Sequence, residues 1–488
     1  MREVIFNGDN VEIYDFPDEV DIIYPPEPIS TSKPAREIVK KAIDDAELKM
    51  SKNSKVVIAF DDVSVPLPLP QTDPRRLMVK EILRKLKSMG IGKEQVTLVC
   101  ATGMHRKCSN AELRQMLGEV VSAYRVVNHD CRDVVSLGET ESGYIVEINR
   151  YAAESDVIIY LSVPFLPMNG GWKSIAVGLG SYACIRQHHL PDILTKSPYM
   201  NPHSDMHRII EEIGRHVAEQ IPVLHIDAVV NNSFYRGFVS KAWKNVRGED
   251  RLDQKLLMSL SNMMPSSIKS RVRRRYRAGY EIAYVAAGEV DEVHSEVLQR
   301  VYEHRGLKIE KKYDALIFGL PNMSPYSVNS ELNPILFHTM VRGYLCNMFE
   351  KMLRKRAFFV VQNPVYEVFD EKQHPAYREF YCKYISKGKT DFDEIESAER
   401  QLVENSKLMN AYGNGFAYHP AHAVIAYYWG ALGMERLEKV VVAGSKSTAL
   451  KPLGFESAED MDEAIKILKE MGCGKIAYVC LPPVFFAY

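Results

Sequence analysis

The stretch that decides the fold is VVIAFDD, residues 56–62, in which five apolar residues are followed by two aspartates. A short apolar run of this kind is typical of a strand buried on both faces of a parallel sheet. Residues 77–86 follow with apolar side chains at helical spacing, and Gly90 can end that helix. The order of buried strand and amphipathic helix predicts a β–α–β arrangement.

The same alternation continues along the chain. Residues 95–101, 124–128 and 156–163 predict three further strands. Ser109 and Glu112 have the spacing of a capping box, which predicts the start of a helix. A second series begins near residue 310, with strands expected at 315–319, 358–361, 440–442 and 476–480 and a final helix at 461–471.

These patterns predict an α/β protein with two α/β domains, mainly parallel sheets and an active-site cleft between the domains. A chain of 488 residues is also longer than one hydrophobic core usually serves. We place an N-terminal α/β domain at residues 1–233, a basic helical insertion or linker at 234–280, and a C-terminal α/β domain at 281–488. The basic run KSRVRRRYR, residues 269–277, is expected to be a solvated helix face.

The amino-acid composition limits the classes of partner that the protein would attract. Lys and Arg number 62 against 63 Asp and Glu, for a formal net charge of −1, so no overall field attracts nucleic acid or a membrane surface. The N-terminal sequence MREVIFNGDNVEIYDFPDEVD has acidic residues where a signal peptide has an apolar stretch, which favours a cytoplasmic protein. The eight cysteines contain no CxxC pair, so we expect reduced packing residues.

One uncharged run, residues 416–434, is long enough to suggest a membrane span. It is interrupted by two histidines, a proline and two glycines: His419, Pro420, His422, Gly430 and Gly433. We therefore expect a buried helix at this position.

Polar residues follow four of the strands expected in the first domain. Asp61 and Asp62 follow the first strand, and residues 102–105 follow the second. Residues 129–130 follow the third, and residues 164–173 follow the fourth. Because ligands bind beyond the carboxyl ends of parallel strands, the sequence predicts a site at this edge of the sheet.

The most informative segment for chemistry is NGGWKSIAVGLGSYACIRQHH, residues 169–189. Gly170 and Gly171 permit close approach of the backbone to a ligand, and Lys173 follows directly. A desolvated lysine can act as a nucleophile or carry a covalent group, whereas an exposed lysine is an ordinary surface residue. The segment alone leaves both interpretations open.

In this segment GGWKS, with His189 sixteen residues after Lys173, resembles the cofactor-attachment segment of the nickel-dependent lactate racemase family. Other segments agree with that family in order and spacing: DVSVP (62–66), TGMHR (102–106), NHD (128–130), MHRIIEE (206–212) and PLGFES (452–457). The similarity covers most of the chain apart from residues 234–280. The combination of these segments indicates the family more specifically than any single segment does.

The resemblance implies a nickel ion held in a sulfur–carbon–sulfur pincer, built on a pyridinium-3,5-bisthiocarboxylic acid mononucleotide that is joined covalently to Lys173. It implies His189 as the nickel ligand, which agrees with the affinity of nickel for imidazole, and His188 is the competing ligand. The first domain would hold the cofactor, and the second would complete the substrate cleft. Proteins that synthesise and insert the cofactor are the implied partners.

The resemblance also implies that His105 is the general base, taking a hydroxyl proton while hydride leaves the same carbon. A purely structural histidine is the alternative. Asp62 would be a cofactor-side carboxylate, although aspartates at strand ends often only cap helices. The residues implied to contact the cofactor are Asp62, Ser64, Gly170, Gly171 and Ser174.

The expected substrate pocket departs from the family. Val65 stands where a carboxylate-binding Arg is expected, and Phe165 stands near the position of a second catalytic His. Arg75 and Arg76 could restore an anion contact or face solvent at a helix start. The residues expected in the pocket are Val65, Phe165, Tyr326, Asn329, Asn333 and His203.

We therefore predict an isomerase, a racemase or epimerase that acts on a hydroxylated small molecule other than lactate by reversible proton-coupled hydride transfer. One alternative is a hydride-based redox or elimination enzyme with the same cofactor. Another is a noncatalytic binder of the nickel nucleotide, which would need Lys173 and His189 but not His105.

Overall fold

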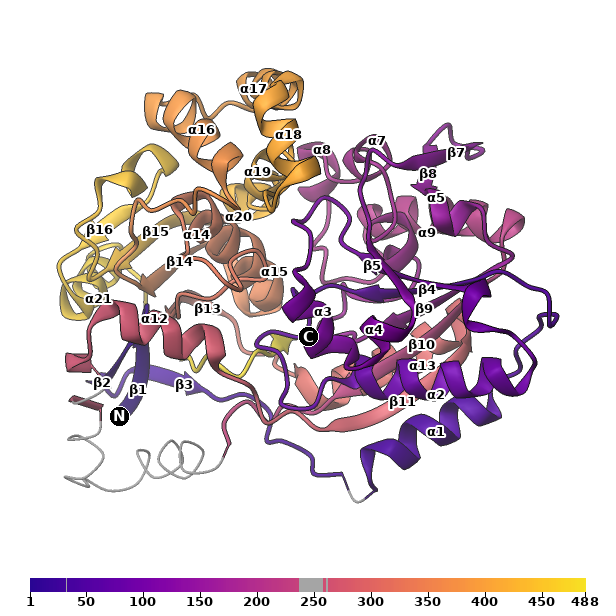
Figure 1. The fold of residues 1–488 in the computed structure, drawn as a ribbon. Helices are drawn as coiled ribbons and strands as arrows, with labels where there is room; N and C mark the ends of the chain where they lie inside the picture. Colours follow the sequence, from indigo (N-terminus) through magenta and orange to yellow (C-terminus); the bar gives the residue numbers. More distant parts are fainter. Residues whose placement is uncertain (32, 237–257, 260–261) are drawn as a thin grey trace.

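The computed structural model describes the whole chain except residues 32, 237–257 and 260–261 (Figure 1). Two six-stranded sheets form its frame, and helices pack around both. The predicted α/β class with two mainly parallel sheets is confirmed.

The first sheet has the strand order β11-β10-β9-β4-β5-β6. Only β11 is antiparallel to its neighbour. The first five residues of β4 are buried, as its unbroken apolar sequence predicts. The strands are β4 (Val56–Asp61), β5 (Val96–Ala101), β6 (Arg125–Asn128), β9 (Val157–Ser162), β10 (Val223–Val230) and β11 (Ile282–Glu289).

The second sheet has the order β16-β15-β14-β13-β17-β3, and all its strands are parallel. The hairpin of β1 (Arg2–Asn7) and β2 (Asn10–Asp15) packs beside it. The strands are β3 (Val20–Ile23), β13 (Tyr313–Gly319), β14 (Leu353–Gln362), β15 (Leu437–Ala443), β16 (Glu456–Ala458) and β17 (Ile476–Val479).

The two sheets do not divide at the predicted boundaries. Strand β3, from the predicted first domain, pairs with β17 of the second sheet. Strand β11, from the predicted second domain, pairs with β10 of the first sheet, and helix α13 (Val290–Arg305) packs on both. Pairing between segments so far apart in sequence depends on tertiary contacts, which a local pattern does not contain.

The predicted helices are present where their end signals stand. Helix α2 (Pro74–Ser88) begins after Asp73, whose side chain accepts a hydrogen bond from the Arg75 backbone N–H. The capping box at Ser109 starts helix α3 (Asn110–Leu117), and the final helix α21 covers Met461–Glu470. The capping box at Ser109 therefore predicted the start of α3, whereas the cap at Asp73 was not predicted.

The uncharged run at 416–434 forms two short buried helices, α19 (His422–Tyr428) and α20 (Ala431–Arg436), where one was expected. They meet at Gly430, where an added Cβ would lie 2.2 Å from Nε2 of His338. Among the described residues, no helix has the length and apolar character that crossing a membrane requires.

The predicted basic segment at 234–280 lies partly outside the described residues. Its described part contains helix α12, Ser266–Arg275, most of whose side chains are exposed as expected. Arg273 pairs with Asp9 and with Glu331, each at 2.7 Å. Acidic partners on the second-sheet side therefore offset part of the basic charge of this helix.

In each sheet, successive strands are added outward on one side, and the chain then returns to add strands on the other side. In the first sheet it proceeds from β4 to β5 and β6, and then returns to place β9 on the other side of β4. In the second sheet the same reversal lies between β13 and β17. Loops diverge at such points and leave a crevice at the carboxyl ends of the strands, where ligands bind.

Candidate active site

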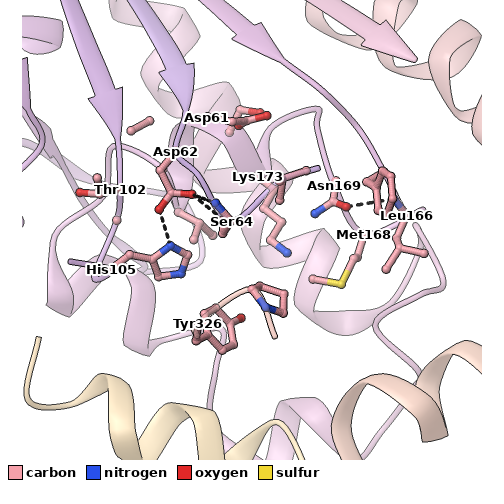
Figure 2. Close-up of a pocket in the computed structure, with 18 of the residues that line it drawn as sticks. Asp61, Asp62, Ser64, Thr102, His105, Leu166, Met168, Asn169, Lys173 and Tyr326 are labelled. Atoms are coloured by element: carbon pink, nitrogen blue, oxygen red, sulfur yellow. Dashed lines mark hydrogen bonds and ion pairs between the residues drawn. The ribbon is translucent and has the colours of Figure 1, made fainter. Parts of the chain in front are cut away.

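A pocket lies where the two reversals face each other (Figure 2). Asp62 reaches it after β4, His105 after β5, and Lys173 after β9. Tyr326 reaches it from the loop after β13, and Val484 from the segment after β17. The pocket therefore combines residues from both sheets.

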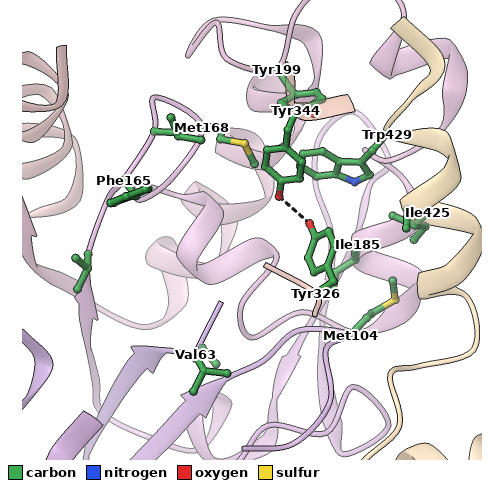
Figure 3. Close-up of a cluster of buried hydrophobic side chains, with 14 of the residues drawn as sticks. Val63, Met104, Phe165, Met168, Ile185, Tyr199, Tyr326, Tyr344, Ile425 and Trp429 are labelled. Carbon is green, nitrogen blue, oxygen red and sulfur yellow. Dashed lines mark hydrogen bonds between the residues drawn. The ribbon is translucent and has the colours of Figure 1, made fainter. Parts of the chain in front are cut away.

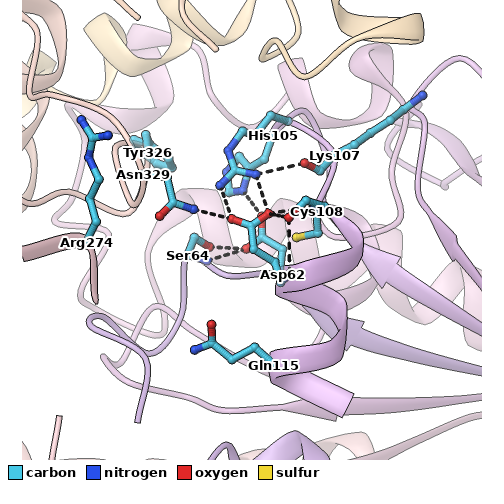
Figure 4. A network of polar contacts seen from close by, with 12 residues as sticks. Asp62, Ser64, His105, Lys107, Cys108, Gln115, Arg274, Tyr326 and Asn329 are labelled. Carbon is cyan, nitrogen blue, oxygen red and sulfur yellow. Dashed lines mark hydrogen bonds and ion pairs between the residues drawn. The ribbon is translucent and has the colours of Figure 1, made fainter. Parts of the chain in front are cut away.

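Asp62 and His105 form a hydrogen-bonded pair, with Nδ1 of His105 2.8 Å from Oδ2 of Asp62 (Figure 4). A carboxylate only accepts hydrogen bonds, so Nδ1 carries a hydrogen, and in the neutral ring Nε2 keeps a lone pair. Burial opposes ionisation of Asp62, but the charge and hydrogen bond of His105 and the hydrogen bonds of Ser64 hold its pKa below the usual range. This arrangement suits His105 as a proton acceptor.

Asp61 joins the ends of β4 and β9. Its carboxylate accepts hydrogen bonds from the Val163 backbone N–H at 2.8 Å, the Ser162 hydroxyl at 2.9 Å and the Tyr160 hydroxyl at 3.0 Å. Burial raises the pKa of Asp61. The reversal point is thus fixed by side-chain bonds as well as by strand pairing.

Arg75 and Arg76 are both committed to protein contacts. Arg75 is fully buried, donates from Nη1 to the backbone carbonyls of Asp61 (2.7 Å) and Asp62 (2.5 Å), and pairs with Asp73. Arg76 donates to backbone carbonyls of helix α3. Neither lines the pocket, so the prediction that they restore an anion contact is wrong.

Lys173 is the first residue of helix α6 (Lys173–Ala176), and its side chain extends into the pocket (Figure 2). Burial lowers the pKa of Lys173 to about 7, and the negative charge of Asp61 only partly opposes this. Its Nζ lies 5.3 Å from the ring centre of Trp429. Near neutral pH much of this amine is therefore unprotonated, which is the form that acts as a nucleophile.

The two glycines before Lys173 have different surroundings. Gly170, at φ +83°, lines the pocket, and an added Cβ would lie 2.8 Å from the Pro164 ring. Gly171, at φ +56°, does not line the pocket, and an added Cβ would lie 2.8 Å from the His294 ring. Gly170 therefore permits approach to a ligand, whereas Gly171 permits close packing. Ser174 also lines the pocket.

His189 and His188 differ in whether they line the pocket and in their hydrogen bonds. Nδ1 of His189 lies 2.9 Å from the Ile185 carbonyl and donates to it, which leaves Nε2 with a lone pair in a ring that lines the pocket. Burial lowers the pKa of His189 to about 3, so the ring is neutral. His188 is fully buried, and within the described chain it neither lines the pocket nor has a hydrogen-bond partner for its ring nitrogens.

A carbonyl that fixes the second ring nitrogen is the usual surrounding of a histidine that binds a metal. His189 has this arrangement and His188 does not. In the part of the chain that the structure describes, no group of three His, Cys, Asp or Glu side chains could hold a metal ion.

Much of the remaining pocket wall is apolar, and Val65 and Phe165 belong to it. Figure 3 shows Phe165, Met168 and Trp429 in a cluster of buried hydrophobic side chains. Behind Phe165 the guanidinium of Arg305 lies 3.7 Å from the ring centre, but it is fully buried and bonds to backbone carbonyls, including that of Asn231 at 2.8 Å. Of the described residues lining the pocket, none is an arginine. The other large side chains of this wall are Leu166, Met168, Met340, Tyr344, Met348, Ile425 and Trp429.

Three residues predicted for the pocket do not line it. Asn329 donates to Oε1 of Glu112 at 2.6 Å, outside the pocket (Figure 4). Asn333 is the N-cap of helix α14 (Pro334–His338), and His203 is exposed to solvent. Tyr326 does line the pocket, and its hydroxyl lies 3.0 Å from that of Tyr344.

The third polar cluster, at residues 129–130, is structural. His129 is fully buried between the Gly180 carbonyl and the Asn149 side chain, at 3.0 Å from each. Asp130 pairs with Arg132 at 2.8 Å. Residues from three of the four clusters therefore line the pocket, and the cluster at 129–130 does not.

The pocket residues that sequence reasoning missed include Tyr344, His422 and Trp429. His422 and Trp429 lie in the uncharged run at 416–434, which was interpreted only as a buried helix. A histidine and a tryptophan seven residues apart in such a run were the available signal, since two helical turns place them on one face.

Replacing Lys173 with Met is expected to stabilise the cofactor-free protein, and more at pH 7 than at pH 10. The pKa of Lys173 is lowered to about 7 in the folded protein, against about 10.4 in an unfolded chain. Between these values the unfolded chain binds a proton that the folded chain releases, so the contribution of Lys173 to stability increases as the pH rises through this window. Urea unfolding of both proteins at both pH values checks this. A difference that does not change with pH would contradict it.

Part of this chain is similar in sequence to known proteins. Residues 8–200 match the lactate racemase N-terminal domain. The lactate racemase of Thermoanaerobacterium thermosaccharolyticum is 30% identical over 178 residues, which are 33% of this chain and 40% of that protein. The lactate racemase of Lactiplantibacillus plantarum is 29% identical over 192 residues, 36% of this chain and 43% of that protein. The matched segment thus spans about two fifths of the length of these relatives.

Solved structures extend the likeness in fold to the whole chain. The lactate racemase apoprotein from Thermoanaerobacterium thermosaccharolyticum covers 100% of both chains, with a TM-score of 0.63 and 18% identity. A protein from Thermotoga maritima covers 93% of this chain and 97% of its own, with a TM-score of 0.51 and 14% identity. At these identities the structural matches establish a common fold.

Proposed function

Since this chain is a distant homologue of the lactate racemases, with that family's N-terminal domain at residues 8–200, we propose that it is a nickel-pincer nucleotide-dependent racemase or epimerase. Its substrate in this proposal is a hydroxylated small molecule other than lactate. The observation that carries the proposal is one pocket that presents the Lys173 amine, the His189 ring and the Asp62–His105 pair.

The residues present fit the cofactor. Lys173 has the lowered pKa that a covalent attachment to its amine requires, and His189 presents a neutral imidazole nitrogen of the kind that nickel binds. Gly170 has no side chain, so a ligand can approach the backbone beside Lys173. Ser64 and Ser174 add hydroxyls to the same pocket. When bound, the nickel-pincer nucleotide would supply a reversible hydride acceptor. We further propose that proteins that synthesise and insert this cofactor are the partners of the chain.

The protein itself handles the proton. His105 presents the Nε2 lone pair because Asp62 holds the hydrogen on Nδ1, so a substrate hydroxyl placed against Nε2 can give up its proton. The positive charge that forms on His105 would be stabilised by the Asp62 carboxylate at 2.8 Å. The apolar wall excludes water from the reacting carbon.

His189→Ala is expected to lose bound nickel, whereas His188→Ala is expected to retain it. His189 lines the pocket with a free ring nitrogen, and His188 is enclosed by protein. Nickel content per chain, measured by elemental analysis after loading, checks this. Nickel retained by His189→Ala and lost by His188→Ala would reverse the assignment.

Loaded enzyme is expected to act on lactate at least about 100-fold more slowly than on a neutral or bulkier hydroxy compound. Val65 and Phe165 offer a carboxylate no cation, and burying an unpaired charge costs a few kcal/mol, or about two orders of magnitude in binding. Following configuration and carbonyl formation with both substrates checks this. Val65→Arg is the matched variant, and it is expected to raise lactate turnover. Rapid racemisation of lactate by the unaltered enzyme would contradict the prediction.

A second candidate is hydride-based oxidation or elimination with the same cofactor. Phe165 favours it, because this side chain lines the pocket and cannot accept a proton on a second face of the substrate. A noncatalytic cofactor carrier is the other alternative, and it would keep its role without His105.

The experiment that tests the proposal is co-expression with enzymes that synthesise the cofactor, followed by intact mass measurement and a screen of hydroxy compounds. A mass increase together with inversion of a carbinol centre supports the proposal. Carbonyl formation without inversion supports the redox alternative, and loading without turnover supports the carrier. A chain that stays unmodified, under conditions that load a lactate racemase, contradicts all three.

A further inference from the structure

His422 lies next to His105 in the pocket and has no role in the proposal so far. It is the first residue of α19, and its ring centre lies 5.1 Å from that of His105, with the planes at 78°. The residue is only 5% exposed, and it lines the pocket. The two imidazoles therefore face the same small volume.

The hydrogen bonds of His422 fix its tautomer. Nδ1 lies 2.6 Å from the hydroxyl of Tyr377, which belongs to helix α16 (Pro375–Lys383) and is fully buried. Among the described residues the Tyr377 hydroxyl has no other hydrogen-bond partner. If His422 donated from Nδ1, the phenol hydrogen would be buried without an acceptor, which carries a desolvation penalty. Tyr377 therefore donates, Nδ1 of His422 accepts, and Nε2 carries the hydrogen.

His105 has the opposite tautomer. The Asp62 carboxylate can only accept, so His105 carries its hydrogen on Nδ1 and a lone pair on Nε2. His422 carries a lone pair on Nδ1 and a hydrogen on Nε2. Burial, together with the histidines around it, also lowers the pKa of His422 well below its usual range, so the ring stays neutral. One pocket thus presents a ring that accepts a proton beside a ring that donates a hydrogen bond.

We infer that His422 is a catalytic hydrogen-bond donor, whose Nε2–H contacts the same substrate oxygen from which His105 takes the proton. This inference rests on the proposed function. In the forward step the substrate O–H bond would break and its proton would move to Nε2 of His105. The C=O bond would form as the C–H electron pair leaves as hydride, for which the cofactor would supply the acceptor when bound. His422 keeps its own proton and stabilises the negative charge that develops on the oxygen.

Tyr377 is the positioning residue in this scheme. Without its hydroxyl, Nδ1 of His422 loses the hydrogen bond that selects the Nε2–H tautomer. Tyr377→Phe should therefore shift His422 toward a mixture of tautomers, although the pocket lining is unchanged. A purely structural role for Tyr377 would not predict such a shift.

The first test needs no cofactor. In the full chain with 15N-labelled histidine, the His422 signals are assigned by their loss in His422→Gln. We expect a neutral Nε2–H tautomer across pH 6–8 in the unaltered protein and a mixture in Tyr377→Phe. A His422 that titrates in this range, or that carries its hydrogen on Nδ1, overturns the inference whether or not the chain binds the cofactor.

The second test uses loaded enzyme. We expect His422→Ala to reduce kcat on the order of 100-fold, the usual effect of removing one such donor, with the cofactor adduct on Lys173 intact by mass. His422→Gln, whose amide can donate from a similar position, should recover most of that loss. His203→Gln, at an exposed histidine outside the pocket, is the matched control and should leave kcat unchanged. Equal kcat in His422→Ala and the unaltered enzyme overturns the inference, whereas an absent adduct in the unaltered chain contradicts the proposed function instead.

Discussion

Lys173→Ala is expected to abolish the proposed covalent nucleotide adduct, which is the largest effect expected of any single substitution in this chain. Lys173 is the one lysine that lines the pocket among the described residues. Burial lowers its pKa to about 7, so its amine can react near neutral pH, whereas an ordinary lysine is almost fully protonated there. Peptide mass spectrometry after co-expression with cofactor-synthesising enzymes measures the adduct directly.

Lys196→Ala is the matched control for this prediction. Lys196 is exposed and lies outside the pocket, so its removal should leave the adduct at full occupancy. A nucleotide found on another lysine, or an adduct that survives in Lys173→Ala, would show that the attachment site is wrongly assigned. Near-UV absorption of the two purified proteins gives an independent measure of loading.

His105→Ala is expected to lower turnover about 10²- to 10⁴-fold while the adduct and the nickel remain, the range typical for loss of a general base. His105 contacts Asp62 and faces the substrate volume, but no observation links it to holding the cofactor. Rapid-mix kinetics of loaded protein, normalised to nickel content, measures the loss. This result also separates an enzyme from a carrier, because a carrier would not need His105.

Asp62→Asn supplies the companion variant. The amide can donate to Nδ1 of His105, which would move the ring hydrogen to Nε2 and remove the lone pair that accepts the substrate proton. We expect a loss of turnover of similar order with the shape of the pocket retained. Full activity in either variant would show that another group takes the proton.

Much of the fold followed from local sequence. The apolar run of β4 and the capping box of α3 both predicted their elements, because burial on two faces and end-capping leave signals within a few residues. The run at 416–434 was predicted as one helix, yet it forms two that meet at Gly430. Gly430 packs closely against His338, and this long-range contact could not be read from the sequence of the run.

The candidate site was only partly predictable. The rule for strand ends predicted that Asp62, His105 and Lys173 would lie near one another, and all three line one pocket. It could not show that Arg75 would be fully buried beneath β4, or that Asn333 would cap a helix, because both outcomes depend on which polar groups meet after folding. Nothing in the sequence indicated that Tyr377, 45 residues from His422, would form a hydrogen bond with it.

The sequence by itself determined the α/β class, the strand ends that bear the polar residues, and the glycine-flanked Lys173, because burial patterns, capping and backbone freedom act over a few neighbouring residues. Only the tertiary structure decided that β3 and β11 pair across the predicted boundaries, and that His189 rather than His188 faces the pocket. It alone also placed Asp62 beside His105 and Tyr377 beside His422. Strand partners, side-chain burial and hydrogen-bond partners come from residues distant in the chain, and such contacts exist only once the two sheets have packed together.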